Sequence, residues 1–136
     1  MKKITMMAIA ICLLVSPSVA NAKKPLDLKC DNREYVIRLV SHSRKMMLQV
    51  DYIMHRESRC RQMAFNPTDP NGGSYGLFQI NGYWCQPSRY SKTGWLQEKN
   101  VLKTCKDLWD PIINAKAFKV MYDYAGWQPW GGKPWI

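Results

Sequence analysis

Apolar residues recur at helical spacing in three stretches of the chain, and these stretches predict most of the fold. The first helix is expected to begin at Asp31 or Asn32, where a short polar side chain can cap its N-terminus. The residues expected on its buried face are Val36, Leu39, Val40 and Ser43. The helical pattern continues over 46–54, with a possible break around 41–43.

The third helical stretch has the clearest boundaries. Asp110 followed by Pro111 is typical of an N-cap and a first helical position, and Gly126 is typical of the residue after a helix. The apolar positions of this helix are Ile113, Ala117, Val120, Met121 and Tyr124. Turn-forming residues at 66–73 predict a loop, while the short apolar run at 75–81 fits either a strand or a helix start. The predicted class is mainly α in a single domain, with α+β as the alternative.

The N-terminus resembles an export signal. A positive start precedes an apolar run at 4–15, which is too short to span a bilayer comfortably, and a small-x-small cleavage site at 20–22. We therefore expect a signal peptide over 1–22, with an uncleaved anchor as the alternative. The remaining chain, 23–136, would be exported and either periplasmic or secreted.

Four cysteines remain after the expected signal, and they favour two disulfides in a small exported domain. They are Cys30, Cys60, Cys85 and Cys105. Three pairings are open, of which Cys30–Cys60 with Cys85–Cys105 gives two local loops that do not cross. Zinc is disfavoured because no pair has the close C-x-x-C spacing. The sequence indicates no metal and no cofactor.

The chain is strongly basic, with a formal net charge of +10. Such a charge favours attraction to anionic polymers such as the cell wall, although it can also serve solubility alone. The basic residues are spread along the chain without a recognition motif, so nucleic acid is not expected as a partner. Stable membrane insertion is not expected either, and protein partners are not identified.

Glu57 is the most informative residue of the second helix. It continues the apolar stripe of Val50, Ile53 and Met54 at the spacing that places residues on one helix face. A carboxylate on an apolar face can keep its proton near neutral pH and donate it to a reacting group. The alternative is a surface glutamate near a helix end.

Ordered motifs around Glu57 carry a family resemblance. Glu57-Ser58 precedes Asn66-Pro67 and then the segment Ser74-Tyr75-Gly76-Leu77-Phe78-Gln79-Ile80-Asn81, which is followed by Gly82-Tyr83-Trp84-Cys85. The chain closes with Gly126-Trp127-Gln128-Pro129-Trp130. This set resembles the lysozyme-like superfamily, which includes small bacterial and phage lytic transglycosylases of the soluble type and lysozymes. Cys105 resembles the partner of Cys85 in that pattern.

The resemblance implies a lysozyme-like fold and cleavage of peptidoglycan at the β-1,4 linkage between N-acetylmuramic acid and N-acetylglucosamine. Glu57 would be the general acid and base. In c-type lysozymes an aspartate directly precedes the Tyr-Gly pair, but Ser74 stands there in this chain. We therefore prefer a lytic transglycosylase that forms 1,6-anhydro ends.

Other interpretations remain open for the reaction. Hydrolysis could use Asp69, which lies where goose-type lysozymes carry an aspartate, but Asp69 could equally be a turn residue. A wall-binding protein without catalysis and a membrane-disrupting antimicrobial are further alternatives.

The resemblance also implies a set of substrate-binding residues, each with a structural alternative. They are Ser58, Ser74, Gly76, Gln79, Asn81 and Tyr124. Tyr124 is displaced by one position from the family's tyrosine. Tyr83 and Trp84 could stack on sugar rings or pack in the core, and the tryptophans of the C-terminal segment, Trp127, Trp130 and Trp135, are expected as core or lid residues.

Overall fold

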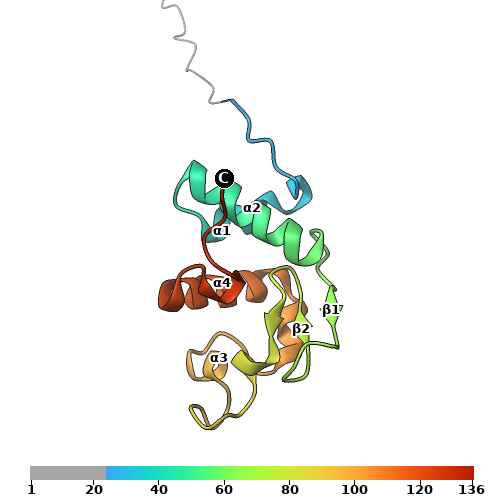
Figure 1. The fold of residues 1–136 in the computed structure, drawn as a ribbon, viewed down its shortest axis with the longest axis vertical. Coiled ribbons are helices and arrows are strands. Elements are labelled where there is room, and N and C mark those ends of the chain that lie inside the picture. Colours follow the sequence, from blue (N-terminus) through green and yellow to red (C-terminus); the bar gives the residue numbers. More distant parts are fainter. Residues whose placement is uncertain (1–23) are drawn as a thin grey trace, which may run out of the picture.

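Helices α1, α2 and α4 frame the molecule, and short strands and turns cover one side (Figure 1). The computed structural model describes residues 24–136, so the expected signal peptide lies outside the described residues. The α-helices are α1 (Glu34–Val40), α2 (Arg44–Ser58), α3 (Trp95–Glu98) and α4 (Pro111–Ala125). The 3-10 helices are η1 (Asp31–Arg33), η2 (Gly82–Cys85), η3 (Cys105–Trp109) and η4 (Gln128–Trp130). The strands are β1 (Phe65–Asn66), β2 (Ser74–Tyr75) and β3 (Ile80–Asn81).

The predicted helix boundaries near Ser43 and Asp110 are confirmed by capping hydrogen bonds. The Ser43 hydroxyl accepts a hydrogen bond from the backbone N–H of Met46 at 3.1 Å, which begins α2 after the predicted break. The Asp110 carboxylate accepts from the N–H groups of Ile112 and Ile113 at 2.8 and 3.0 Å. Gly126 follows α4 with a φ of +59°.

The core lies between α1, α2 and α4, and it corrects one predicted face. Val36 and Val40 are buried as expected, but Leu39 is 52% exposed and Ile37 is buried instead. The reason is that α1 packs on α4 through the stripe 36, 37 and 40, from which residue 39 points away. Ser43 is an exposed cap rather than a core residue.

The C-terminal end of α4 shows a second departure from the buried positions that the sequence predicted. Ala117 and Met121 are buried, whereas Tyr124 is 70% exposed at the end of the helix. In the C-terminal segment, Trp127 and Trp130 are buried as expected, but Trp135 is fully exposed and is not a core residue.

The segment 75–81 is neither one strand nor a helix. It contributes to two strands of a small antiparallel sheet of order β1-β2-β3, separated by a turn at 76–79. Asn114 of α4 is fully buried against this turn: its Nδ2 donates to the Tyr75 and Leu108 carbonyls, and its Oδ1 accepts from the Phe78 N–H. Asn114 therefore fixes the sheet on α4.

Two disulfides, Cys30–Cys60 and Cys85–Cys105, confirm the arrangement of two local loops. The first joins the segment before η1 to the end of α2. The same segment is held by Asp51, whose carboxylate accepts from the backbone N–H groups of Lys29 and Cys30 at 2.9 and 2.8 Å. The class is mainly α, and within residues 24–136 no helix has the length and apolar character needed to cross a bilayer.

Candidate active site

Glu57 lies where the buried face of α2 reaches the surface. Val50, Ile53 and Met54 on the same face are fully buried, while the Glu57 side chain is 24% exposed. The helix ends one residue later, because Arg59 adopts a left-handed conformation with φ of +53°. The carboxylate is therefore partly shielded and still accessible to a ligand.

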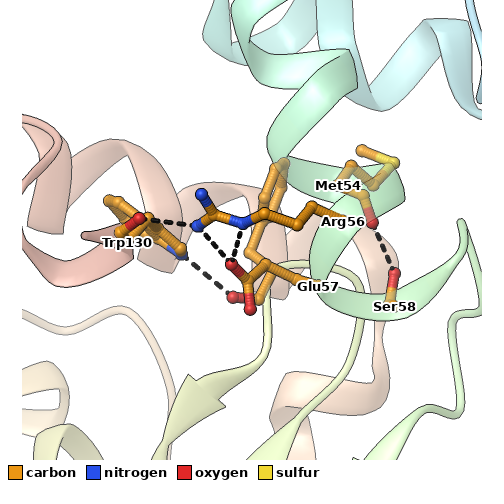
Figure 2. Close-up of polar contacts among 6 residues, drawn as sticks. Met54, Arg56, Glu57, Ser58 and Trp130 are labelled. Carbon is orange, nitrogen blue, oxygen red and sulfur yellow. Dashed lines mark hydrogen bonds and ion pairs between the residues drawn. The ribbon is translucent and has the colours of Figure 1, made fainter. Parts of the chain in front are cut away.

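Arg56 binds the Glu57 carboxylate directly (Figure 2). Its Nε donates to Glu57 Oε1 at 2.9 Å, and its Nη2 donates to the same oxygen and to the backbone carbonyl of Trp130 at 2.6 Å. The Trp130 ring in turn donates from Nε1 to the Phe78 carbonyl at 3.0 Å. These contacts connect the end of α2 to η4 and to the turn at 76–79.

The arginine changes the expected chemistry of the site. The sequence pattern predicted an apolar setting for Glu57, but its nearest polar partner is a guanidinium. A ligand that approaches this oxygen of Glu57 must displace the guanidinium or share the carboxylate with it.

Ser58 is turned into the protein, away from Glu57 (Figure 2). Its side chain is buried, and its hydroxyl donates to the Met54 carbonyl at 3.0 Å within α2. This bond accounts for the hydroxyl hydrogen without a ligand, so a substrate-binding role for Ser58 stays a prediction.

The small sheet brings three predicted residues together. Ser74 is paired with Asn66 on one side and with Asn81 on the other, and Asn81 Nδ2 lies 3.3 Å from Ser74 Oγ. Asp69 accepts a hydrogen bond from Asn66 Nδ2 at 2.9 Å. Asn66, Ser74 and Asn81 therefore form one polar row across β1, β2 and β3, and Asp69 is attached to this row through Asn66.

Gln79 and Gly76 have contacts that shape the turn between β2 and β3. Gln79 Nε2 donates to the carbonyls of Ala64 and Gly76 at 3.2 and 3.1 Å. Gly76 has a φ of +72°, and a Cβ there would lie 2.4 Å from both Asn114 Nδ2 and the Leu108 carbonyl oxygen. Only glycine fits this approach of the turn to α4.

Tyr124 belongs to a third cluster, which is aromatic. An open pocket of about 400 Å³ contains Tyr83, Trp84, Tyr90, Trp95 and Tyr124 in its wall. The Trp95 ring centroid lies 5.2 Å from both the Trp84 and the Tyr124 centroids. Exposed aromatic faces of this kind can stack on apolar sugar faces. The sequence analysis missed Tyr90 and Trp95, and no motif in the sequence identifies them.

The predicted residues thus fall into three groups: Glu57 at the end of α2, the polar row of the sheet, and the aromatic pocket. Arg56 and Asn114 were missed. Arg56 was adjacent to Glu57 in the sequence, but neighbouring residues on a helix do not face each other, so its ion pair was not expected.

Comparison with protein families places the chain among known domains. The family described as lysozyme-like domain matches residues 43–132. The matched range contains Glu57, the three strands and the aromatic pocket. Such a domain indicates glycosidase activity of the kind that acts on peptidoglycan, and the two disulfides fit an exported protein. The chain belongs to the lysozyme-like domain family.

Proposed function

We propose that this protein is a peptidoglycan lytic transglycosylase that uses Glu57 as its general acid and base. The bond cleaved is the β-1,4 linkage between N-acetylmuramic acid and N-acetylglucosamine, and the product carries a 1,6-anhydro end. Residues 23–136 would form the exported, mature domain.

The observation that carries this proposal is the position of Glu57. Its carboxylate ends a helix face whose preceding residues are fully buried, and it remains 24% exposed inside the range that matches the family. Partial shielding is what a proton donor needs, because a fully hydrated carboxylate is ionised near neutral pH.

The proposed reaction has two proton transfers at one residue. Glu57 first gives a proton to the glycosidic oxygen as the bond from this oxygen to C1 of the muramic acid breaks, while the N-acetyl oxygen of the same sugar assists at C1. The Glu57 carboxylate then takes the proton of the C6 hydroxyl, whose oxygen bonds to C1 and closes the anhydro ring. Arg56 binds Oε1 of Glu57, so the guanidinium must move away or share the carboxylate with the substrate.

The sheet supports the preference for a ring-closing reaction. Ser74, which replaces the aspartate of c-type lysozymes, is buried and close to Asn81 Nδ2. Asp69, in the turn after β1, accepts a hydrogen bond from Asn66. Since Ser74 cannot supply a carboxylate, Asp69 is the residue that a hydrolytic mechanism would need as its second acid.

Mass analysis of the fragments released from purified cell-wall sacculi tests this function. The proposal predicts muramic acid ends that are one water lighter than the hydrolysis product. Fragments with hydrated ends alone would show a hydrolase instead, and binding to sacculi without any released fragment would show a non-catalytic wall-binding protein.

An Asp69→Asn variant separates the two reactions further. The amide keeps an oxygen that can accept the hydrogen bond from Asn66, so the turn should persist. The proposal predicts fragment release near the wild-type rate. A loss of release by more than about tenfold, in the range of a missing base or nucleophile, would instead favour hydrolysis with Asp69 as the second carboxylate.

A further inference from the structure

A polar pocket lies at the N-terminal end of α2, at the opposite end from Glu57. It is open, measures about 390 Å³, and is lined by residues from the start of α2, the end of α4 and the C-terminal segment. Figure 1 shows the C-terminal segment running from α4 to the corner between α1 and α2. Lys45 and Glu57 lie twelve positions apart in α2, which is about 18 Å along the helix axis. The pocket is therefore distinct from the candidate active site.

The charge of this pocket is positive. Lys45 and Lys133 contribute to its wall from α2 and from the C-terminal segment, and both side chains are exposed. The start of α2 adds the positive end of the helix dipole, where acidic residues are normally favoured. The first turn of α2 contains Arg44 and Lys45 and no acidic residue. These positive charges on one wall of the pocket favour an anion as its ligand.

A buried amide in the same pocket lacks a hydrogen-bond partner. Gln49, one turn after Lys45, is 5% exposed and contributes to the pocket wall. Its Nε2 is buried and has no partner within residues 24–136. An unpaired buried donor costs about 1–3 kcal/mol, so such groups normally have a partner, which a ligand can supply.

We propose that this pocket binds a phosphate group, with Lys45, Lys133 and Gln49 as its ligands. The two ammonium groups and the helix end together present more than one positive charge, which matches a phosphate dianion better than a singly charged carboxylate. The phosphate group is therefore a monoester, which can belong to a lipid headgroup or to a soluble phosphorylated molecule. The Gln49 side chain turns its buried Nε2 toward the pocket and donates to a phosphate oxygen.

An NMR titration with inorganic phosphate tests the site on the full mature chain. The Gln49 side-chain amide signals should shift and saturate, whereas sodium chloride at equal ionic strength should leave them in place. Lys45→Met and Lys133→Met should each weaken binding by about tenfold, the effect of one lost hydrogen bond to a charged group. Both lysines are exposed, so the fold should persist in either variant.

Lys92→Met is the matched control, because Lys92 is exposed and lies outside the pocket. Three results would overturn the proposal: an unmoved Gln49 amide, equal weakening by Lys92→Met, or acetate that binds as tightly as phosphate. Vesicles containing phosphatidic acid, whose headgroup is a phosphomonoester, identify the source. Vesicle binding that Lys45→Met abolishes assigns a lipid headgroup, and phosphate binding without vesicle binding assigns a phosphate outside a membrane. Neither result depends on whether Glu57 is catalytic.

Discussion

Helix α2 carries two carboxylates in contrasting environments, Asp51 in its middle and Glu57 at its end. Asp51 is 3% exposed and accepts hydrogen bonds from two backbone N–H groups of the N-terminal segment. Glu57 is 24% exposed on its side chain and accepts from the side chain of Arg56. One carboxylate is bound by groups that cannot move without unfolding the segment, and the other by a side chain that can rotate away.

The difference suggests that two carboxylates of one helix have different roles, one in the stability of the fold and the other in the reaction. Backbone donors hold the buried Asp51 carboxylate on the N-terminal segment, which favours a structural role. The Arg56 contact to Glu57 is partly exposed and therefore weak, so a ligand can displace it at low cost. We attribute the fold to the first environment and the reaction to the second.

The Cys30–Cys60 disulfide joins the N-terminal segment, which Asp51 binds, to the residues that follow Glu57. Removing this disulfide should have the largest effect on stability. Replacing both cysteines by serine should lower the free energy of unfolding by about 3–4 kcal/mol, because the unfolded chain regains the freedom of a loop of this length. Urea unfolding monitored by tryptophan fluorescence measures this loss. An unchanged midpoint would mean that Asp51 alone holds the N-terminal segment on α2.

Asp51→Asn should have the next largest effect. The amide keeps one acceptor oxygen but places N–H donors against the N–H groups of Lys29 or Cys30. We expect a loss of about 2–3 kcal/mol in the free energy of unfolding, with activity per folded molecule unchanged. Urea unfolding and a sacculus assay on the same sample check both parts. Lost activity in a folded variant would contradict a purely structural role.

Arg56→Met should change activity more than stability. Without the guanidinium, a ligand no longer has to displace an ion pair to reach Glu57, so the cleavage rate should rise by about tenfold or less. The initial rate of sacculus cleavage measures this change. Arg38→Met is the matched control, because Arg38 pairs with Glu34 on the exposed face of α1, and the same rise in this variant would contradict the proposed role of Arg56.

The smallest effect is expected at Asp107, which, like Asp51, is bound by backbone donors. Hydrogen bonds from the N–H groups of Thr104 and Lys103 lower the pKa of Asp107. Because the pKa is lower in the folded state, the stabilisation is present above the unfolded pKa of about 4 and is lost as the pH falls through the folded value. Asp107→Asn should cost about 1 kcal/mol at pH 7, the usual value of a cap.

Unfolding measured across pH tests this prediction. The stability difference between wild type and Asp107→Asn should shrink as the solution becomes more acidic than pH 4. A difference that stays constant with pH would mean that the carboxylate charge does not contribute.

Local chemistry determined which parts of the fold could be predicted from the sequence. The start of α4 at Asp110 and its end at Gly126 depend on residues within one turn, so the prediction was correct. The orientation of α1 depends on its packing against α4, which periodicity alone does not specify, and Leu39 was therefore misplaced.

In the candidate site, too, local features could be predicted and long-range contacts could not. Glu57 was identified because its helical stripe and the following motif lie close together in the sequence. Its contact with Arg56 depends on the Trp130 carbonyl, 74 residues away, and could not be predicted. Asn114 was missed because the carbonyls and the N–H that it binds become neighbours only after α4 packs on the sheet.

The most direct test of the proposed role of Glu57 is the release of fragments from purified sacculi by Glu57→Gln, with the unfolding free energy measured on the same sample. We predict a loss of at least about a hundredfold in cleavage rate, as expected for a missing general acid, with unfolding unchanged. Glu34→Gln, on the exposed face of α1, should cleave at the wild-type rate. Wild-type cleavage by folded Glu57→Gln protein would contradict the role of Glu57 as the catalytic acid.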